Sequence, residues 1–317
     1  MNPILLTTIQ TVVILSLAPL SVGLTRFFKA RLQGRHGAAP WLPYITYATM
    51  LKKETIVSAS SSWMFRVAPY IVLSSSVFMA LVLPLVTSGG VLASFSNFLL
   101  VAAVLALGSA FLVMAGLDVG SAFGGMGASR EMTIASLLEA TIILTFAAFA
   151  LATGTSTIDG MLASASNVSI MIASAPYLCL SLVALILISL AENARYPVDN
   201  PATHLELTMV HEAMILDYSG PYLAMMEYAS TLKLTVFALL VANFVMPWPL
   251  MTTTSTGGSI LFALLMTLVK LVIVLFAVAL LESTIAKMRF YRVQEFLTGA
   301  FFMALTGLAL ALLSQLL

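Results

Sequence analysis

The sequence predicts an all-α membrane protein that crosses the bilayer about eight times, and its composition is the first reason. Only 9% of the 317 residues are charged and 61% are hydrophobic, whereas a soluble domain carries about 25% charged residues. The mean hydropathy is +1.06. Because so few charges cannot cover a water-facing surface, a soluble enzyme, a disordered chain and a nucleic-acid-binding protein are excluded.

The second reason is the spacing of apolar stretches. A helix needs about 20 apolar residues to cross a hydrocarbon core of roughly 30 Å. The first stretch is not expected to be a cleaved signal peptide, because its basic residues follow the apolar run. No internal repeat is visible, so we expect a single transmembrane domain over residues 1–317. Eight stretches meet the length requirement: residues 3–24, 67–88, 97–116, 132–152, 170–191, 231–248, 259–281 and 296–316.

The third reason is the placement of basic residues, which also orients the predicted helices. The first, third, fifth and seventh connections hold twelve Lys and Arg residues, whereas the second, fourth and sixth hold none and Asp159 is their only charge. Cytoplasmic connections carry the excess of Lys and Arg. We therefore expect the odd connections to be cytoplasmic and both termini to lie on the outer side, as in a protein of a bacterial inner membrane. This asymmetry indicates that a cytoplasmic partner docks on the inner face.

The first cytoplasmic connection contains an amphipathic pattern. Trp41, Tyr44, Ala48 and Leu51 recur at helical spacing, and two lysines follow. This pattern predicts an amphipathic helix that lies on the membrane surface. A lipid-surface anchor is the simpler interpretation of this helix, and the wall of a lateral opening toward the membrane is the other.

The third connection, residues 116–131, contains five glycines, which favour backbone turns. It lacks the Lys followed by Ser or Thr that a phosphate-binding loop requires. Asp118, Arg130 and Glu131 are candidates for a polar seam against the fifth connection. Plain interfacial charges are an equally good interpretation of these three residues.

The fifth connection is the richest in polar residues. Asn200 and Pro201 form a typical helix start, and we expect that helix to continue to Asp217. His211 is followed by Glu212, but Ile215 stands where a zinc hydrolase of this motif has its second histidine, which excludes that class. Structural hydrogen bonding is the simpler role for the histidines. Two pairs of polar residues share a face of the predicted helix: His204 with His211, and Glu206 with Asp217.

Two charges lie inside predicted spans. A lysine at the bilayer centre costs at least ~2.5 kcal/mol and normally faces protein or water. Lys270 and Glu139 are therefore functional candidates, and we expect the fourth, fifth and seventh spans to meet around a polar core that holds them together with Glu192. Snorkelling of the side chain toward the interface is a sufficient explanation for three charges at span ends: Glu192, Lys233 and Glu282.

Taken together, these residues resemble one family. The run from Glu192 through Arg195, Pro197 and Asp199 to Pro201, followed by Glu206-Leu207 and then Asp217-Tyr-Ser-Gly220, is similar to the signature of the complex I subunit 1 family. That family contains the quinone-chamber subunit of respiratory complex I and its counterparts in membrane-bound nickel–iron hydrogenases. The third connection, with Asp118, Arg130-Glu131 and Glu139, looks closer to the hydrogenase and formate hydrogenlyase branch.

The resemblance implies a subunit without a redox centre or metal of its own. Its partners would be the hydrogenase large and small subunits and iron–sulfur subunits on the cytoplasmic side, antiporter-like membrane subunits, and lipid. Residues that fall on the ion-coupling positions of the family, where proton or sodium movement is coupled to electron transfer, are Glu139, Glu192, Asp199, Glu206, Glu227 and Lys270. Residues predicted to dock the cytoplasmic partner are Asp118, Arg130, Glu131, Arg195, His204, His211 and Asp217.

The sequence departs from the family pattern after Pro201. The family commonly has Glu-x-Glu-x-Glu-Leu there, and this chain has Ala202-Thr-His204-Leu-Glu206-Leu. Two acids are thus missing, and one is replaced by a histidine that titrates near neutral pH. Two functions remain open: an anchoring and coupling subunit of a hydrogenase complex, and a quinone-binding subunit of a complex I relative, with quinone at a shared interface. A free-standing transporter is a weaker third, because the outer face carries so few features.

Overall fold

The computed structural model describes residues 2–165, 175–199, 209–247, 250–252, 255, 257–285, 288 and 290–316. Within these residues the regular secondary structure is helical, apart from two isolated bridges, Thr87 with Met251 and Asn97 with Thr157. Eight of the described helices are long and apolar enough to cross a membrane. The predicted all-α class with eight spans is therefore confirmed.

The helices follow one another along the chain with short connections. The eight spanning helices are α1, α3, α4, α5, α8, α10, α11 and α12, and the short helices α2, η1, α6 and α9 lie between them. Their bounds are α1 Pro3–Leu32, α2 Leu42–Met50, α3 Trp63–Val82, η1 Ala93–Phe95, α4 Phe98–Asp118, α5 Ala122–Thr153, α6 Ile158–Ala165, α8 Ala175–Glu192, α9 His211–Ile215, α10 Gly220–Val245, α11 Gly257–Thr284 and α12 Phe290–Leu316.

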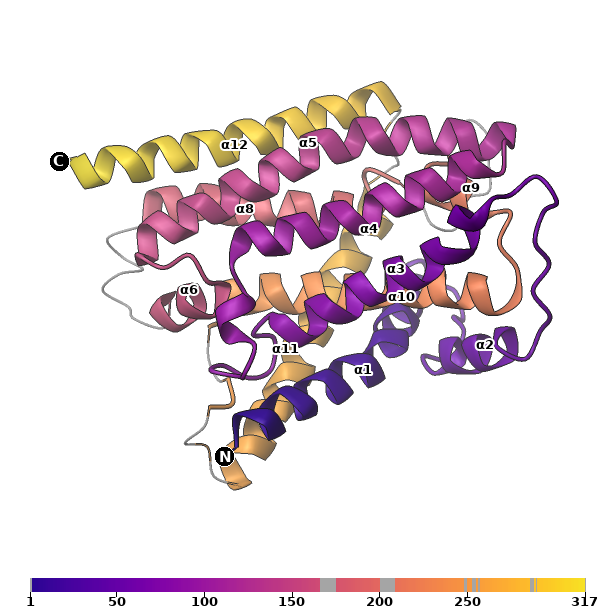
Figure 1. Ribbon diagram of the computed structural model, residues 1–317. Coiled ribbons are helices and arrows are strands. Elements are labelled where there is room, and N and C mark those ends of the chain that lie inside the picture. Colours follow the sequence, from indigo (N-terminus) through magenta and orange to yellow (C-terminus); the bar gives the residue numbers. More distant parts are fainter. Residues whose placement is uncertain are drawn as a thin grey trace.

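Five of the spanning helices form two groups on either side of α10, and α3 and α4 pack together beside them. Helices α5, α8 and α12 pack side by side, and α1 packs with α11 on the other side of the molecule, as Figure 1 shows. Helix α10 contacts α1, α3, α8 and α11, and it is the most buried of the eight spans. The side chains of α10 are therefore the ones that reach both groups.

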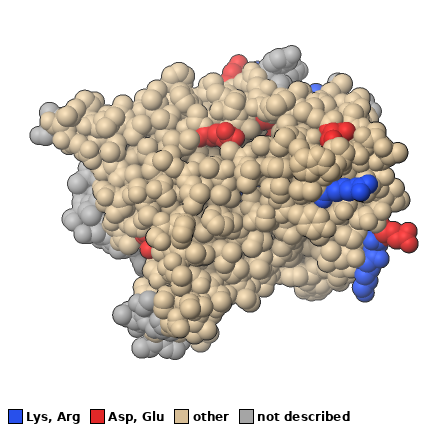
Figure 2. Space-filling model, viewed as in Figure 1, with Lys and Arg blue, Asp and Glu red and all other residues tan. Residues whose placement is uncertain are grey.

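The two ends of the bundle differ in the elements that they carry. Both termini lie at the end with α6, and α2 and α9 lie at the opposite end (Figure 1). On the face drawn in Figure 2, the visible Lys and Arg side chains gather at the α2 and α9 end. The helix expected in the first connection is present as α2, and Trp41 at its start is exposed.

Several helices differ in length from the predicted spans. Helix α5 begins at Ala122, so most of the glycine-rich third connection is helical and only Val119–Ser121 separate it from α4. The glycines serve packing: a Cβ atom on Gly124 would meet the carbonyl oxygen of Gly116 on α4. The expected backbone turn occurs at Gly120, whose φ is +72°, whereas Gly124 allows the close approach of two helices.

The second span ends earlier than expected. Helix α3 stops at Val82, whereas the apolar run continues to Thr87. Pro84 follows directly and has no N–H to continue the helix. Residues Leu83–Thr87 are buried although they are not helical, so their backbone groups need partners from neighbouring helices.

Candidate functional site

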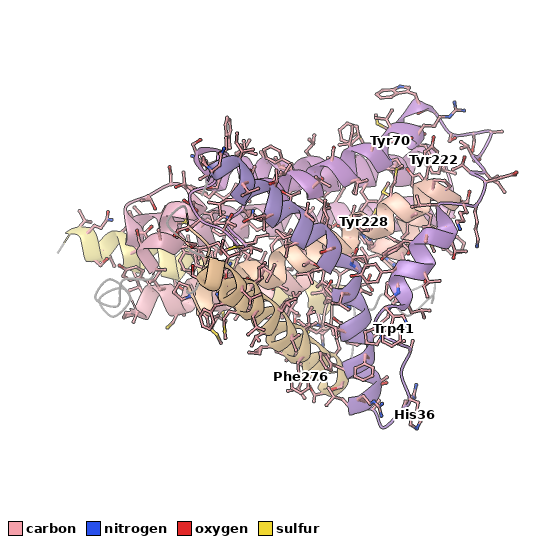
Figure 3. All side chains as sticks on the ribbon, turned by 90° about the horizontal axis from the view of Figure 1, so that it is seen from below. His36, Trp41, Tyr70, Tyr222, Tyr228 and Phe276 are labelled. Atoms are coloured by element: carbon pink, nitrogen blue, oxygen red, sulfur yellow. The ribbon has the colours of Figure 1, made fainter. Side chains whose placement is uncertain are left out.

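A cavity of about 100 Å³ opens among α1, α2, α9 and α10 at the end that carries the basic residues. Tyr47 of α2 contributes one wall, and its ring stands edge-on to Tyr228 of α10 at 5.9 Å between centroids. Figure 3 labels Tyr228, whose hydroxyl donates to the Leu15 carbonyl of α1 at 2.8 Å. The remaining lining residues are Val22, Arg26, Arg195, His211, Glu212, Ile215, Glu227, Ser230 and Thr231.

The pKa values of Glu212 and His211 in this cavity are both shifted toward the uncharged form of the side chain. Burial, with the nearby carboxyls of Glu227 and Asp199, raises the pKa of Glu212 to about 7, although Arg26 opposes the shift. Burial and the Lys233 ammonium lower the pKa of His211 to about 4, against a smaller opposite effect of Asp199. The cavity therefore places a carboxyl that can gain or lose a proton near pH 7 beside a neutral imidazole.

Charged groups continue from this cavity into the bundle. His211 also lines a second cavity of about 40 Å³, which is otherwise mainly apolar and reaches Lys233 of α10. Lys233 Nζ forms an ion pair with Glu192 Oε1 of α8 at 3.0 Å. Glu192 interacts electrostatically with two carboxyls of α5, Glu131 and Glu139.

The order of these groups runs from the cavity toward α5. Glu212 and Glu227 come first, followed by His211, the Lys233–Glu192 pair, and finally Glu131 and Glu139. Three non-adjacent segments of the chain bring these side chains together: α9 with α10, α8, and α5. We call this set the charged row.

Glu282 at the end of α11 is a junction that the sequence interpretation missed. It is buried and binds two cations, Lys29 of α1 at 3.0 Å and Arg195 at 3.1 Å. Lys29 also lies 4.6 Å from the centre of the Tyr196 ring. Burial of Glu282 and Arg195 beside the partly buried Lys29 is tolerated because the three charges neutralise one another in part and share hydrogen bonds. No short-range pattern in the sequence connects these residues, which are far apart along the chain.

Lys270 is buried and has a polar partner, as expected, but it does not share a core with Glu139 and Glu192. Its Nζ donates to Asn243 Oδ1 of α10 at 3.0 Å. Helix α11 packs chiefly against α1 and α10, whereas Glu192 pairs with Lys233. The expected polar core of the fourth, fifth and seventh spans is wrong, because α10 stands between α11 and the α5–α8 group.

Three residues predicted to dock a partner make hydrogen bonds within the chain. Asp118 Oδ2 accepts from the backbone N–H groups of Ser62 and Phe65 at 2.7 and 3.3 Å, at the N-terminus of α3. Arg130 donates to the Met209 carbonyl at 2.8 Å. Asp217 accepts from the Ser121 hydroxyl at 2.8 Å and remains exposed. These bonds join α3, α4, α5 and α9, and a docking role for the same residues stays a prediction.

Two predicted site residues, His204 and Glu206, lie outside the described residues. The continuous helix expected from Pro201 to Asp217 is wrong, because α9 begins only at His211. Met209 and Val210 precede it in a non-helical conformation. The Arg130 bond to the Met209 carbonyl uses a backbone acceptor that a continuing helix would have needed.

The eight packed spans define a multi-pass membrane protein with charged groups inside the bundle. The sequence model of the family described as NADH dehydrogenase matches residues 4–313. The chain therefore belongs to this family, whose members are of the complex I subunit 1 type.

Two characterised relatives come from Escherichia coli (strain K12). The chain is 31% identical to "Hydrogenase-4 component C" over 90% of this chain and 89% of the relative. It is 30% identical to "Formate hydrogenlyase subunit 4" over 89% and 90% of the two chains. Both relatives are subunits of larger complexes by their names, and both align along nearly the whole chain.

A solved structure supports the fold. A chain in the structure of the membrane-bound sulfane sulfur reductase, an archaeal respiratory membrane complex, superposes with a TM-score of 0.79. The superposition covers 98% of this chain and 99% of the other, at 16% sequence identity. At that identity the similarity establishes the shared arrangement of helices.

The raised pKa of Glu212 predicts a specific dependence of stability on pH. A carboxyl with a higher pKa in the folded than in the unfolded chain stabilises the fold below its unfolded pKa, and this contribution is lost as the pH rises through about 7. Relative to Glu212→Gln, the wild-type protein should lose on the order of 3 kcal/mol between pH 4.5 and 8. Thermal unfolding of both proteins in detergent across this range measures the difference.

A difference in melting temperature that does not change with pH would contradict the assigned environment of Glu212. Glu295→Gln is the matched control, since Glu295 of α12 is exposed. Its melting temperature should follow that of the wild-type protein at every pH.

Proposed function

We propose that this protein is the membrane-anchoring and ion-coupling subunit of a hydrogenase or formate hydrogenlyase type of complex in a bacterial inner membrane. The charged row from the cavity to Glu139 is the observation that carries the coupling role. Identities of 31% and 30% to two subunits of such complexes support the class of complex. The hydrogenase large and small subunits, iron–sulfur subunits and antiporter-like membrane subunits are the proposed partners.

The charged row suits proton transfer because its members differ in charge and burial. A carboxyl that exchanges a proton near pH 7 can respond to a charge change at the cavity when an electron arrives in a neighbouring subunit. The Lys233–Glu192 pair lies between the cavity and α5, so a change in either charge alters the electrostatic energy of the groups on both sides. Proton movement along the row would then be linked to electron transfer outside this chain.

The proposed docking surface lies beside the cavity, at the end with α2 and α9. It consists of Ile56, Leu216, Asp217 and the first turn of α5. Ile56 is 75% exposed although its backbone is held by the Ser219 hydroxyl at 2.8 Å. Exposed apolar side chains on an ordered segment outside the spans favour a protein partner. The basic residues of the odd connections support the cytoplasmic side for this surface.

Quinone binding is a second proposal, and the cavity beside α2 favours it. Arg26, Tyr47 and Ser230 offer hydrogen-bond donors that fit the carbonyl oxygens of a quinone head. Chemical assay of the native purified complex for nickel and for quinone separates the proposals. Nickel without quinone supports the hydrogenase class, and quinone without nickel supports a complex I relative.

The docking role predicts an effect of charge at Ile56. Ile56→Asp should remove most of the soluble redox subunits from the purified membrane complex. The free energy needed to bury a carboxylate without a partner exceeds the binding free energy that an apolar interface residue contributes. Co-purification with a tagged form of this chain measures the effect. Val91→Asp is the control, since Val91 is 50% exposed at the opposite end of the bundle. Equal recovery of the soluble subunits with both variants would exclude this surface.

The coupling role predicts an effect at Glu139 that leaves electron transfer intact. In vesicles that contain the whole complex, Glu139→Gln should abolish most of the ion gradient formed per turnover, while turnover with artificial electron carriers is retained. A glutamine keeps the shape and hydrogen bonds but cannot carry a proton. Glu295→Gln on the exposed face of α12 is the control. An unchanged gradient with Glu139→Gln would show that this carboxyl is structural.

A further inference from the structure

The buried, non-helical residues Leu83–Thr87 after α3 are held by a side chain of α1. Gln10 Nε2 donates to the carbonyls of Ala80 and Leu83 at 3.0 and 2.7 Å. Gln10 Oε1 accepts from the backbone N–H and the hydroxyl of Thr87 at 3.0 and 2.9 Å. Non-helical backbone at membrane depth occurs where it is buried in protein or lines a water-filled space.

Asn243 of α10 connects the same segment to Lys270. Its Nδ2 donates to the carbonyls of Leu85 and Pro84 at 2.9 and 3.2 Å. Its Oδ1 accepts from Lys270 Nζ at 3.0 Å. Within the part of the chain that the structure describes, Lys270 forms no ion pair, in contrast to Lys233. A buried lysine whose partner is a neutral amide is a costly arrangement if its only function is packing.

The polar groups continue from Gln10 toward the end of the bundle that carries the termini. A cavity of about 10 Å³, enough for one water molecule, is lined by Gln10, Thr87 and Asp159 among others. Asp159 Oδ1 accepts from the Gly89 N–H at 3.2 Å. Partial burial raises the pKa of the Asp159 carboxyl. Asp159, the single charged residue of the second, fourth and sixth connections, thus lies at the end of this polar set that is nearest the termini.

We propose that Lys270, Asn243, Leu83–Thr87, Gln10 and Asp159 form an outward proton-release path that is separate from the charged row. The Lys270 ammonium loses one proton to a water molecule: an N–H bond breaks, an O–H bond forms, and a neutral amine and a hydronium ion result. A proton that the ion-coupling function supplies from the inner side then restores the ammonium, so that the step can repeat. Asp159 takes the proton from this water and gives it to the outer solution. This proposal rests on the proposed ion-coupling function, and it adds to that function the residues through which protons leave on the outer side.

The amide and carbonyl groups have a defined task in this path. Asn243 Oδ1 fixes the ammonium, its Nδ2 holds the Leu85 carbonyl, and Gln10 holds the Leu83 carbonyl of the same segment. Neither amide exchanges protons itself near neutral pH, so both are positioning residues. Water between Lys270 and Asp159 carries the proton, and the space near Thr87 is where such water would stand.

The test measures access of a small cation to Thr87 from each side of the membrane. Cys179 is the single cysteine of the chain, so Thr87→Cys is made together with Cys179→Ser. Silver ions are added to sealed vesicles of either orientation, and thiols that remain free are alkylated after solubilisation and counted by mass spectrometry. Thr145→Cys is the matched control, because Thr145 is also buried within α5 and its hydroxyl donates to the Thr141 carbonyl of the same helix.

The expected result is protection of the Thr87→Cys thiol from the outer side about tenfold faster than that of Thr145→Cys, because a water-sized polar cavity admits a small cation and close apolar packing does not. Protection should also be slower from the side of the basic connections. Equal rates for the two cysteines, or faster protection from the inner side, would overturn the proposal. The assay needs no turnover, so it separates failure of the outlet from failure of the ion-coupling function.

A second variant keeps the proposal testable if Thr87→Cys does not fold. Asp159→Asn preserves an oxygen acceptor for the Gly89 N–H but removes the titratable group. In vesicles with the whole complex, it should remove the dependence of the proton-release rate on outer pH below neutrality, while electron transfer persists. Release with unchanged dependence on outer pH would also overturn the proposal.

Discussion

The free-energy cost of removing a charge from water is the constraint on which the arrangement of the helices depends most. In a bundle with so few charged residues, the buried Glu282 pairs with Lys29 and Arg195, and the partly buried Glu192 pairs with Lys233. Each of these pairs joins segments that are far apart along the chain, so the ion pairs also help to fix which helices are neighbours. Helix α10 occupies the centre because it supplies Lys233 to one group of helices and Asn243 to the other.

Composition predicts the membrane class, the spacing of apolar stretches predicts the eight spans, and an amphipathic pattern predicts the helix in the first connection. The lengths of α5 and α10 were not predictable from hydropathy, because these helices continue beyond the apolar run into polar sequence at the basic end. The early end of α3 had a signal in Pro84, which the continuous apolar run from residue 67 to 88 obscured. Hydropathy reports where a chain avoids water, whereas helix ends depend on local hydrogen bonding.

For the candidate site, the sequence identified charged residues but not their partners. Snorkelling is a sufficient explanation of Lys233 and Glu282 from the sequence, and Glu192 is also expected in a polar core, yet the structure pairs each of the three with an opposite charge. Pairing depends on which helices are adjacent, and no spacing within one helix contains that information. Gln10 and Asn243 did have a signal, since an amide inside an apolar span needs a partner. Family resemblance supplied the coupling role of Glu139 and Asp199, and that role remains a prediction.

Replacement of the Lys233–Glu192 pair by neutral residues tests most directly whether the buried charges serve ion movement or only packing. Glu192→Gln together with Lys233→Met removes both charges and leaves neither one unpaired, so the fold should be retained. In vesicles that contain the whole complex, we expect normal assembly and normal electron transfer with the ion gradient lost. A full ion gradient in the double variant would contradict a coupling role for the charged row.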